Sequence, residues 1–106
     1  MKKVFCIKLQ GKRKFLRLFG SSSKEKGLVS GFVALKPGKA VGLHNTKNKE
    51  EALIILKGRA QVCCGKNPNV RKVKAISFVY IPPKTDHDIK NIGKGVLRYV
   101  YLTASV

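Results

Sequence analysis

The sequence predicts an all-β fold of one domain, an antiparallel sandwich or barrel. Short runs rich in β-branched and aromatic residues alternate with turn-forming residues, and no segment keeps an amphipathic helical period for three turns. The 106 residues are 43% apolar, which suits one compact core and is too short for a second. The expected strands are Val4–Leu9, Phe15–Phe19, Leu28–Leu35, Gly42–Thr46, Ala52–Leu56, Ala60–Cys64, Val70–Lys74, Ser77–Ile81, Asp88–Asn91 and Val96–Thr103.

Turn chemistry separates these strands. Glycine and asparagine accept the positive φ of tight turns, proline fixes φ, and serine side chains bond nearby backbone groups. Strands spaced this closely are typical of sandwiches and barrels. Residues 1–106 are expected to form a single domain, in which residues 1–27 supply leading strands and a basic loop. The turns are expected at Gln10–Lys12, Gly20–Ser23, Pro37–Lys39, Lys47–Lys49, Gly65–Asn69, Pro82–Pro83 and Gly93–Gly95.

The chain is strongly basic. It has 23 Lys and Arg against 5 Asp and Glu, for a net charge of +18. Such a surface attracts anions, and the basic amino-terminal third offers contacts to nucleic-acid phosphates. No RNA-recognition or helix-turn-helix signature accompanies the charge, which favours a solvated basic face that steers anionic small molecules.

Neither a membrane span nor a secretory leader is expected. Because Lys or Arg recurs throughout, no window approaches the roughly 18 apolar residues of a membrane helix. The basic start is followed by the apolar run Val4–Ile7, but Lys8 ends it below the about 7 to 15 residues of a signal peptide. We therefore expect a cytoplasmic protein that does not bind membranes.

The three cysteines, Cys6, Cys63 and Cys64, do not predict a disulfide framework. Their count is odd, and an adjacent pair does not readily bridge within a regular strand. Small apolar core residues are the expected role, with a soft metal ligand or a redox-sensitive thiol as the alternative. Core filling is also expected of the strand aromatics Phe32, Phe78, Tyr80, Tyr99 and Tyr101.

Carboxylates gather around the only two histidines, His44 and His87. Four of the five acids lie within seven residues of one of them, in a chain that otherwise avoids negative charge, so the pattern indicates a site. Alternate residues of a strand share a face, so His44 and Thr46 are expected to line one wall. The four acids are Glu50, Glu51, Asp86 and Asp88.

Strand alternation sorts these acids only in part. It places Glu50 and Glu51 on opposite faces of a returning strand, and parity alone does not decide which one faces the histidines. Asp86 and Asp88 each neighbour His87 directly, so they are expected to face away from its cavity and to screen the basic surface.

Two stretches resemble the motifs of the small single-domain cupin family. The first, about residues 38–58, contains Gly38, His44-Asn45-Thr46, Glu51 and Gly58. The second, about residues 76–91, contains Pro82-Pro83-Lys84-Thr85-Asp86-His87 and Asn91. Order and spacing both agree, and the resemblance covers roughly residues 31–103. It implies a jelly-roll barrel of two sheets and, because small cupins often pair through their sheets, a homodimer.

The resemblance also implies a metal site. The family's ligands fall on His44, Glu51 and His87, because Glu51 has the expected distance to the glycine that closes the first motif; Glu50 stays as the alternative carboxylate. Thr46 stands at the fourth ligand position, commonly a second histidine, and its hydroxyl is a poor ligand for most transition metals. Two imidazoles and one carboxylate are the ligand set of the facial triad, which leaves coordination positions open on Fe(II). The same ligands would also hold Mn, Ni, Co, Cu or Zn, and the sequence does not distinguish among these metals.

The second motif departs from the family pattern at two glycine positions. Ile76 stands at the glycine that usually opens the motif, and Lys84 at the glycine after its proline. Because lysine lacks easy access to positive φ, we expect the loop before His87 to be reshaped.

Three functions follow from these features. The first is a small cupin that binds a divalent transition metal and binds or acts on a small anionic or oxygen-rich molecule; as an enzyme it would be a metal-dependent oxygenase or isomerase. The second is a non-enzymatic ligand-binding or sensor barrel without metal. The third is a nucleic-acid-binding barrel driven by the positive charge.

Overall fold

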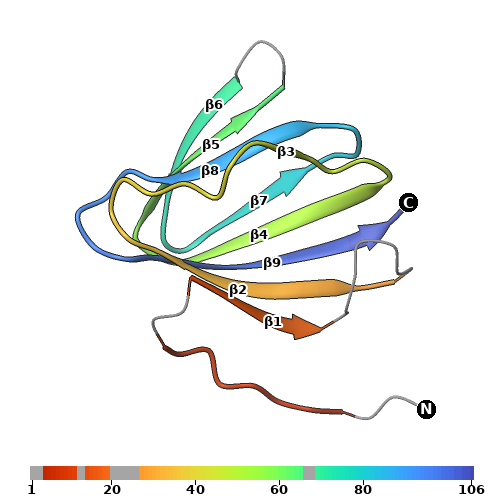
Figure 1. Ribbon diagram of the computed structural model, residues 1–106, viewed down its shortest axis with the longest axis horizontal. Helices are drawn as coiled ribbons and strands as arrows, with labels where there is room; N and C mark the ends of the chain where they lie inside the picture. The colour runs from red at the N-terminus through yellow and green to blue at the C-terminus, as the bar shows by residue number, and fades with distance from the viewer. Residues whose placement is uncertain (1–3, 12–13, 20–26, 66–68) are drawn as a thin grey trace.

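The computed structural model describes residues 4–11, 14–19, 27–65 and 69–106. The strands in these residues pair antiparallel and form two sheets that face each other (Figure 1). One sheet has the order β1-β2-β9-β4-β7, and the other has the order β3-β8-β5-β6. The strands are β1 (Phe15–Phe19), β2 (Val29–Leu35), β3 (His44–Asn45), β4 (Lys49–Lys57), β5 (Arg59–Cys64), β6 (Asn69–Lys74), β7 (Ser77–Ile81), β8 (Asp86–Asn91) and β9 (Leu97–Ser105).

Alternating apolar side chains fill the space between the sheets. On β4, Leu53 and Ile55 are fully buried, while Ile54 between them is only partly buried because it points to the other face. Val62 of β5 and Ile89 of β8 meet them from the second sheet. Complete burial of side chains of this size stabilises the fold by about 1.5–3 kcal/mol each.

Gly58 lets the chain cross from β4 in one sheet to β5 in the other. Its φ is +96°, a conformation that side chains disfavour. A Cβ at this position would lie 3.0 Å from the Val96 carbonyl oxygen and 3.1 Å from Leu97 Cα. The glycine that closes the first motif is therefore required both by its own backbone and by the start of β9.

The all-β prediction and the jelly-roll arrangement are confirmed. Strands Phe15–Phe19 and Ser77–Ile81 have the predicted bounds, and most others differ by one to three residues at an end. The strand predicted at Gly42–Thr46 shrinks to the two residues of β3; on one side of it the Gly42 N–H donates to the Asp88 side chain, and on the other the Thr46 N–H donates to the Thr85 carbonyl in the loop before β8.

The leading strand predicted at Val4–Leu9 is wrong. Residues 4–11 form no strand, and Val4 and Phe5 are exposed, although the Phe5 ring stacks on Phe19 with centroids 5.8 Å apart. β-propensity expresses packing on a half-buried surface, which this segment does not have. Of the remaining leading region, β1 forms as predicted, and residues 1–3, 12–13 and 20–26 lie outside the described residues.

The prediction that the cysteines and the strand aromatics fill the core is confirmed for only some of these residues. Cys64 packs against the core, and burial together with the neighbouring Cys63 raises the pKa of its thiol, but Cys6 is exposed. Phe78 and Tyr80 on the edge strand β7 are 67% and 53% exposed, so the prediction is wrong for them.

The homodimer stays a prediction. In the described part of the chain no helix is long and apolar enough to cross a membrane.

Candidate metal centre and cavity

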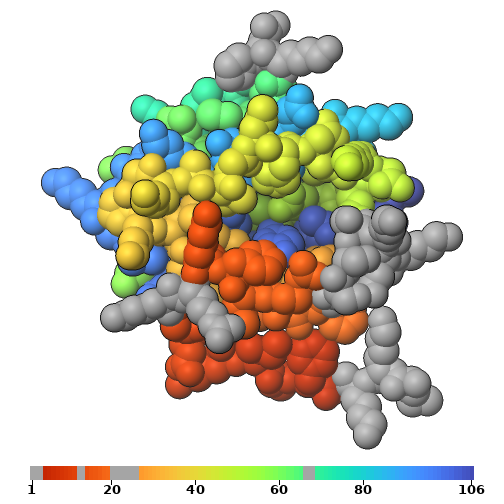
Figure 2. Space-filling model, viewed as in Figure 1, coloured from red at the N-terminus to blue at the C-terminus, as the bar shows by residue number. Residues whose placement is uncertain are grey.

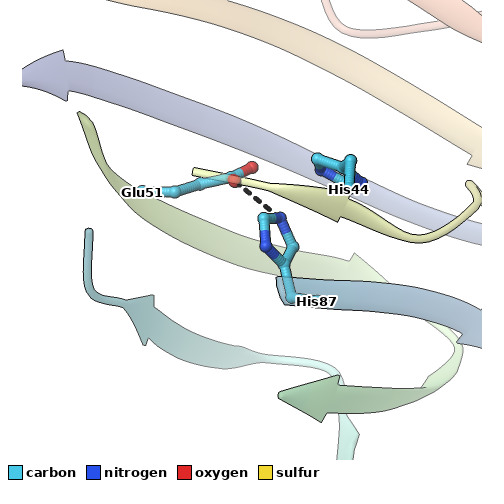
Figure 3. Close-up of side chains that lie close together, drawn as sticks. All are labelled: His44, Glu51 and His87. Atoms are coloured by element: carbon cyan, nitrogen blue, oxygen red, sulfur yellow. Dashed lines mark ion pairs between the residues drawn. The ribbon is translucent and has the colours of Figure 1, made fainter. Parts of the chain in front are cut away.

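Three side chains from three strands converge between the sheets. His44 lies on β3, His87 on the neighbouring β8, and Glu51 on β4 of the facing sheet (Figure 3). His44 and His87 are register partners, and their ring centroids are 3.9 Å apart. One potential ligand atom from each residue lies within 4.8 Å of the others, so the three predicted ligands are brought together.

The three residues differ in burial. His87 is completely buried and Glu51 is 7% exposed, whereas His44 is exposed. The cluster therefore has a closed side at His87 and an accessible side at His44.

Each imidazole is oriented by a backbone carbonyl. His44 Nδ1 lies 2.8 Å from the Gly42 oxygen, and His87 Nδ1 lies 3.1 Å from the Thr85 oxygen. A carbonyl oxygen only accepts, so each Nδ1 carries a hydrogen and each Nε2 of a neutral ring keeps its lone pair. Such outer contacts fix the tautomer and the ring direction of a metal-binding histidine.

The His87 Nε2 atom is buried without a hydrogen-bond partner among the described residues. It lies 3.1 Å from Glu51 Oε1, which is an ion-pair distance, but the contact does not meet hydrogen-bond geometry. An orphaned imidazole nitrogen beside a carboxylate and a second imidazole offers the donor types that divalent transition metals take. The residues present therefore fit a metal ion.

The same contact sets the protonation of His87. Burial, the strongest influence, lowers its pKa, but the contacts with Glu51 and the Thr85 carbonyl and the charges of Glu51 and Asp88 together outweigh it. The net result is a pKa above the usual range of an imidazole. A proton on Nε2 thus compensates the Glu51 carboxylate when no cation does.

Thr46 stands next to the cluster, but its hydroxyl is engaged elsewhere. Its Oγ1 donates to the Pro82 carbonyl at 2.8 Å and accepts the Thr85 N–H at 3.0 Å. Both contacts tie the end of β3 to the loop that leads into His87. In that loop Lys84 adopts φ +56°, and its N–H donates to the Lys47 carbonyl at 2.8 Å, so the loop makes a left-handed turn without a glycine.

The structure separates the two glutamates that parity left open. Glu51 of β4 is the register partner of Ile81 on β7 and of Thr103 on β9, and it is buried beside His87. Glu50 instead accepts a hydrogen bond from the Tyr80 hydroxyl at 2.7 Å, in an exposed position. Glu50 is therefore not the carboxylate of the cluster.

Asp86 and Asp88 do more than screen surface charge, the role predicted for them. Asp88 Oδ1 accepts the Gly42 N–H at 2.9 Å, and Asp86 Oδ1 accepts from the Asn45 side chain at 2.7 Å. Both carboxylates hold the short β3 segment against β8. Their role was missed because it depends on the pairing of segments more than 40 residues apart.

A cavity of about 580 Å³ opens beside the cluster. In Figure 2 its mouth is the hollow between the orange β1 and the yellow β3 region, with the blue of β9 behind it. His44 and Glu51 line it, and so do Tyr99 and Tyr101 of β9, for which the sequence favoured core filling over contact with a ligand. Tyr99 both lines the cavity and belongs to the core. Burial holds the pKa of its hydroxyl well above the usual range.

Comparison with known proteins identifies relatives of this architecture. A family model described as "Cupin domain" matches residues 31–103. No curated protein sequence matches the chain. The cupin domain of Schizosaccharomyces pombe Cnp3 is 26% identical, with a TM-score of 0.78 over 94% of this chain and 69% of that one.

Two further solved structures show the same fold. A cupin family protein with a double-stranded β-helix fold from Methanocaldococcus jannaschii is 23% identical, with a TM-score of 0.80 over 98% of this chain and 91% of that one. A recombinant oxalate oxidase in complex with glycolate is 25% identical, with a TM-score of 0.69. That match spans 74% of this chain but only 42% of the oxidase.

Proposed function

Because this chain belongs to the cupin domain family, we propose that it binds one divalent transition metal ion through His44, Glu51 and His87. We further propose that the adjoining cavity binds a small anionic or oxygen-rich molecule. The observation that carries the proposal is the buried His87 Nε2, which faces Glu51 and His44 without a hydrogen-bond partner in the described residues. Such a nitrogen costs stability unless a proton or a cation occupies the position in front of it.

Each residue has a defined part in this proposal. His87 and His44 present Nε2 lone pairs held in place by the Thr85 and Gly42 carbonyls. Glu51 supplies the negative charge that offsets part of the charge of the ion. When bound, the ion would act as a Lewis acid on an oxygen of the ligand. The exposed side of His44 leaves a path to that position from the cavity.

The comparisons support the proposed ligand class. One neighbour is an oxalate oxidase that holds glycolate, a small hydroxy acid rich in oxygen. The net charge of +18 would raise the local concentration of such anions around the cavity.

Metal titration tests the proposal. Chelator-treated protein, purified without an affinity tag that binds metal, is titrated with Co(II) and followed by visible absorption and by elemental analysis. We expect one equivalent of Co(II) to bind, and Glu51→Gln to weaken binding by at least about tenfold. Glu50→Gln is the matched control, because its carboxylate bonds the exposed Tyr80. The absence of uptake of Co(II), Fe(II), Mn(II), Ni(II), Cu(II) and Zn(II) would exclude the metal site.

A second function, a metal-free ligand-binding barrel, is favoured by the 3.1 Å contact between His87 and Glu51. When His87 is protonated, its positive charge offsets the negative charge of Glu51, so the site is electrostatically balanced without a metal ion. Glycolate binding separates the two functions. Equal affinity in chelator-treated and Co(II)-loaded protein, retained in the double variant His44→Ala/His87→Ala, would favour the metal-free barrel.

A further inference from the structure

The cavity wall formed by β1 and β9 carries an arginine whose position is fixed by its neighbours. Arg17 of β1 is the register partner of Gly31 on β2, and Gly31 is the register partner of Tyr101 on β9. Arg17 and Tyr101 line the same cavity as His44 and Glu51. The guanidinium therefore faces the cavity that also gives access to the metal centre.

Gly31 makes the approach of Arg17 and Tyr101 possible. A Cβ on Gly31 would lie 2.6 Å from Cζ and 2.7 Å from the hydroxyl oxygen of Tyr101, so the phenol lies directly over the glycine. In this position Tyr101 lies close enough to Arg17, across the width of β2, for the two to interact: burial raises the pKa of the Tyr101 hydroxyl, and the charge and hydrogen-bonding of Arg17 act against that rise. The absence of a side chain on the middle strand thus brings together two residues from the strands on either side of it.

Phe15 holds the pair from a second direction. Its ring stacks on Tyr101 with centroids 5.9 Å apart, and the Arg17 guanidinium carbon lies 5.6 Å from its centroid. Contact with an aromatic face attracts a guanidinium and lowers the entropy lost when it binds a ligand. Arg17 is exposed to solvent and yet oriented by two aromatic side chains.

The charges along the cavity favour an anion. Among the described residues that line it, the cationic side chains are Arg17, Lys47 and Lys49, and the one acid is Glu51, which belongs to the proposed metal centre. Valine and isoleucine side chains supply the apolar part of the wall: Val29, Val33, Val41 and Ile89. The cavity volume, about 580 Å³, is within the range of sites for molecules larger than a two-carbon acid.

We propose that the ligand of this cavity is an organic carboxylate with an apolar body, and that Arg17, held by Tyr101 and Phe15, binds its carboxylate. A guanidinium presents paired N–H donors that match the two oxygens of a carboxylate. The apolar body then lies against the aliphatic wall, between Arg17 and the triad. This inference deepens the proposed function and rests on the cavity being its ligand site. Arg17 is the specificity-determining residue, and Tyr101 is a positioning residue.

Benzoate and benzamide test the inference, because they share shape and differ in charge. Their affinities are measured by calorimetry in about 0.15 M salt, so that the net charge of the protein is screened equally in every sample. We expect wild-type protein to prefer benzoate, and Arg17→Met to weaken benzoate binding by about tenfold while benzamide binding changes little. Arg71→Met is the matched control, because Arg71 lies on the exposed strand β6 outside the cavity lining.

Tyr101→Phe tests the positioning role. It keeps the ring over Gly31 and removes the hydroxyl, so we expect the preference for benzoate over benzamide to fall severalfold, an effect that a merely structural role would not produce. Equal binding of benzoate and benzamide by wild-type protein would overturn the inference without the need for any variant. An Arg17→Met protein that keeps the full preference for benzoate would overturn it as well.

The metal proposal fails separately. Each protein is assayed with benzoate after chelation and after Co(II) loading, and its Co(II) affinity is measured independently. Arg17→Met is expected to leave Co(II) affinity unchanged, since Arg17 is not one of the clustered ligands. If wild-type protein takes up no Co(II) but still binds benzoate in a way that depends on Arg17, the metal site is rejected and this inference is kept. If Co(II) binds but benzoate binding does not depend on Arg17, only this inference is rejected.

Discussion

Thr46 and Thr85 bind each other twice. The Thr46 hydroxyl accepts the Thr85 N–H at 3.0 Å, and the Thr46 N–H donates to the Thr85 carbonyl at 3.2 Å. That carbonyl is the same one that orients His87 through Nδ1. Thr46, which stands where the family motif commonly has a second histidine, therefore acts on the site through the loop that holds His87.

Thr46→Val tests this role because it removes the hydroxyl and keeps the side-chain shape. The variant leaves the Pro82 carbonyl and the Thr85 N–H without their partner, at a cost of about 1–3 kcal/mol in unfolding free energy. We expect Co(II) affinity to fall by about tenfold as His87 loses its fixed orientation. Thr46→Ser keeps the hydroxyl and is expected to restore most of both losses. Unchanged Co(II) affinity in Thr46→Val would show that the loop holds His87 without Thr46.

Asp88 gives the equivalent support to His44. It accepts the Gly42 N–H, and the carbonyl of the same Gly42 orients His44. In Asp88→Ala we expect the two-residue strand β3 to loosen and Co(II) affinity to fall by about tenfold. Asp88→Asn retains an acceptor oxygen and is expected to bind Co(II) nearly as well as the wild type. Amide hydrogen exchange at Gly42 provides a readout independent of metal, and it should accelerate in the alanine variant only.

The protonation of His87 predicts opposite pH trends for metal-free stability and for metal binding. Its pKa in the folded protein lies above the unfolded value of 6.5. Protonated His87 therefore stabilises the metal-free fold fully below the unfolded pKa, and this contribution is lost as the pH rises through the folded pKa. Co(II) needs a neutral Nε2, so its affinity should fall as the pH falls through the folded pKa.

Two measurements check these trends. Titration of the His87 ring by NMR gives the folded pKa, and Co(II) affinities between about pH 5 and 8 give the metal dependence. In Glu51→Gln the attraction that raises the pKa is removed, so the His87 pKa should drop and the stability of the metal-free protein should lose part of its dependence on pH. A His87 pKa below the unfolded value in the wild type would contradict the prediction.

Because Leu53 is fully buried in the core beside the site, its truncation is expected to lower stability strongly. Leu53 is fully buried two residues from Glu51, and Leu53→Ala is expected to lower the unfolding free energy by about 2–5 kcal/mol. Leu43→Ala, at a position 73% exposed, is the matched control and should change it by less than about 0.5 kcal/mol. Denaturant unfolding measures both, and a small effect of Leu53→Ala would place the core elsewhere.

The sequence predicted the parts of the fold that depend on local pattern. Period-two alternation and turn residues gave most strands, because each strand buries one face and each turn needs particular backbone angles. The residues 4–11 show the limit of this reasoning: an apolar run predicts a strand, but a strand also needs a partner, and pairing is not encoded in the run itself.

The three residues that cluster in the structure were predicted from the sequence, whereas the residues that support them were missed. His44, Glu51 and His87 could be picked out by spacing, whereas Arg17 and Tyr101 lie 84 residues apart and meet only through the register of three strands. Their one local signal is Gly31 in the middle of a strand, a position where glycine often marks a close approach of another group.

Gly31 therefore allows a direct test of how sequence sets the geometry of the cavity wall. Gly31→Ala places a methyl group where the Tyr101 ring lies, and we expect a loss of about 1–3 kcal/mol in unfolding free energy. In a Tyr101→Leu background no ring lies over residue 31, so the same substitution should cost clearly less. Denaturant unfolding of the four proteins gives the coupling between the two positions. If Gly31→Ala lowers the unfolding free energy equally in both backgrounds, the Tyr101 ring moves away from residue 31 at little energetic cost. In that case Gly31→Ala would not separate Arg17 from Tyr101.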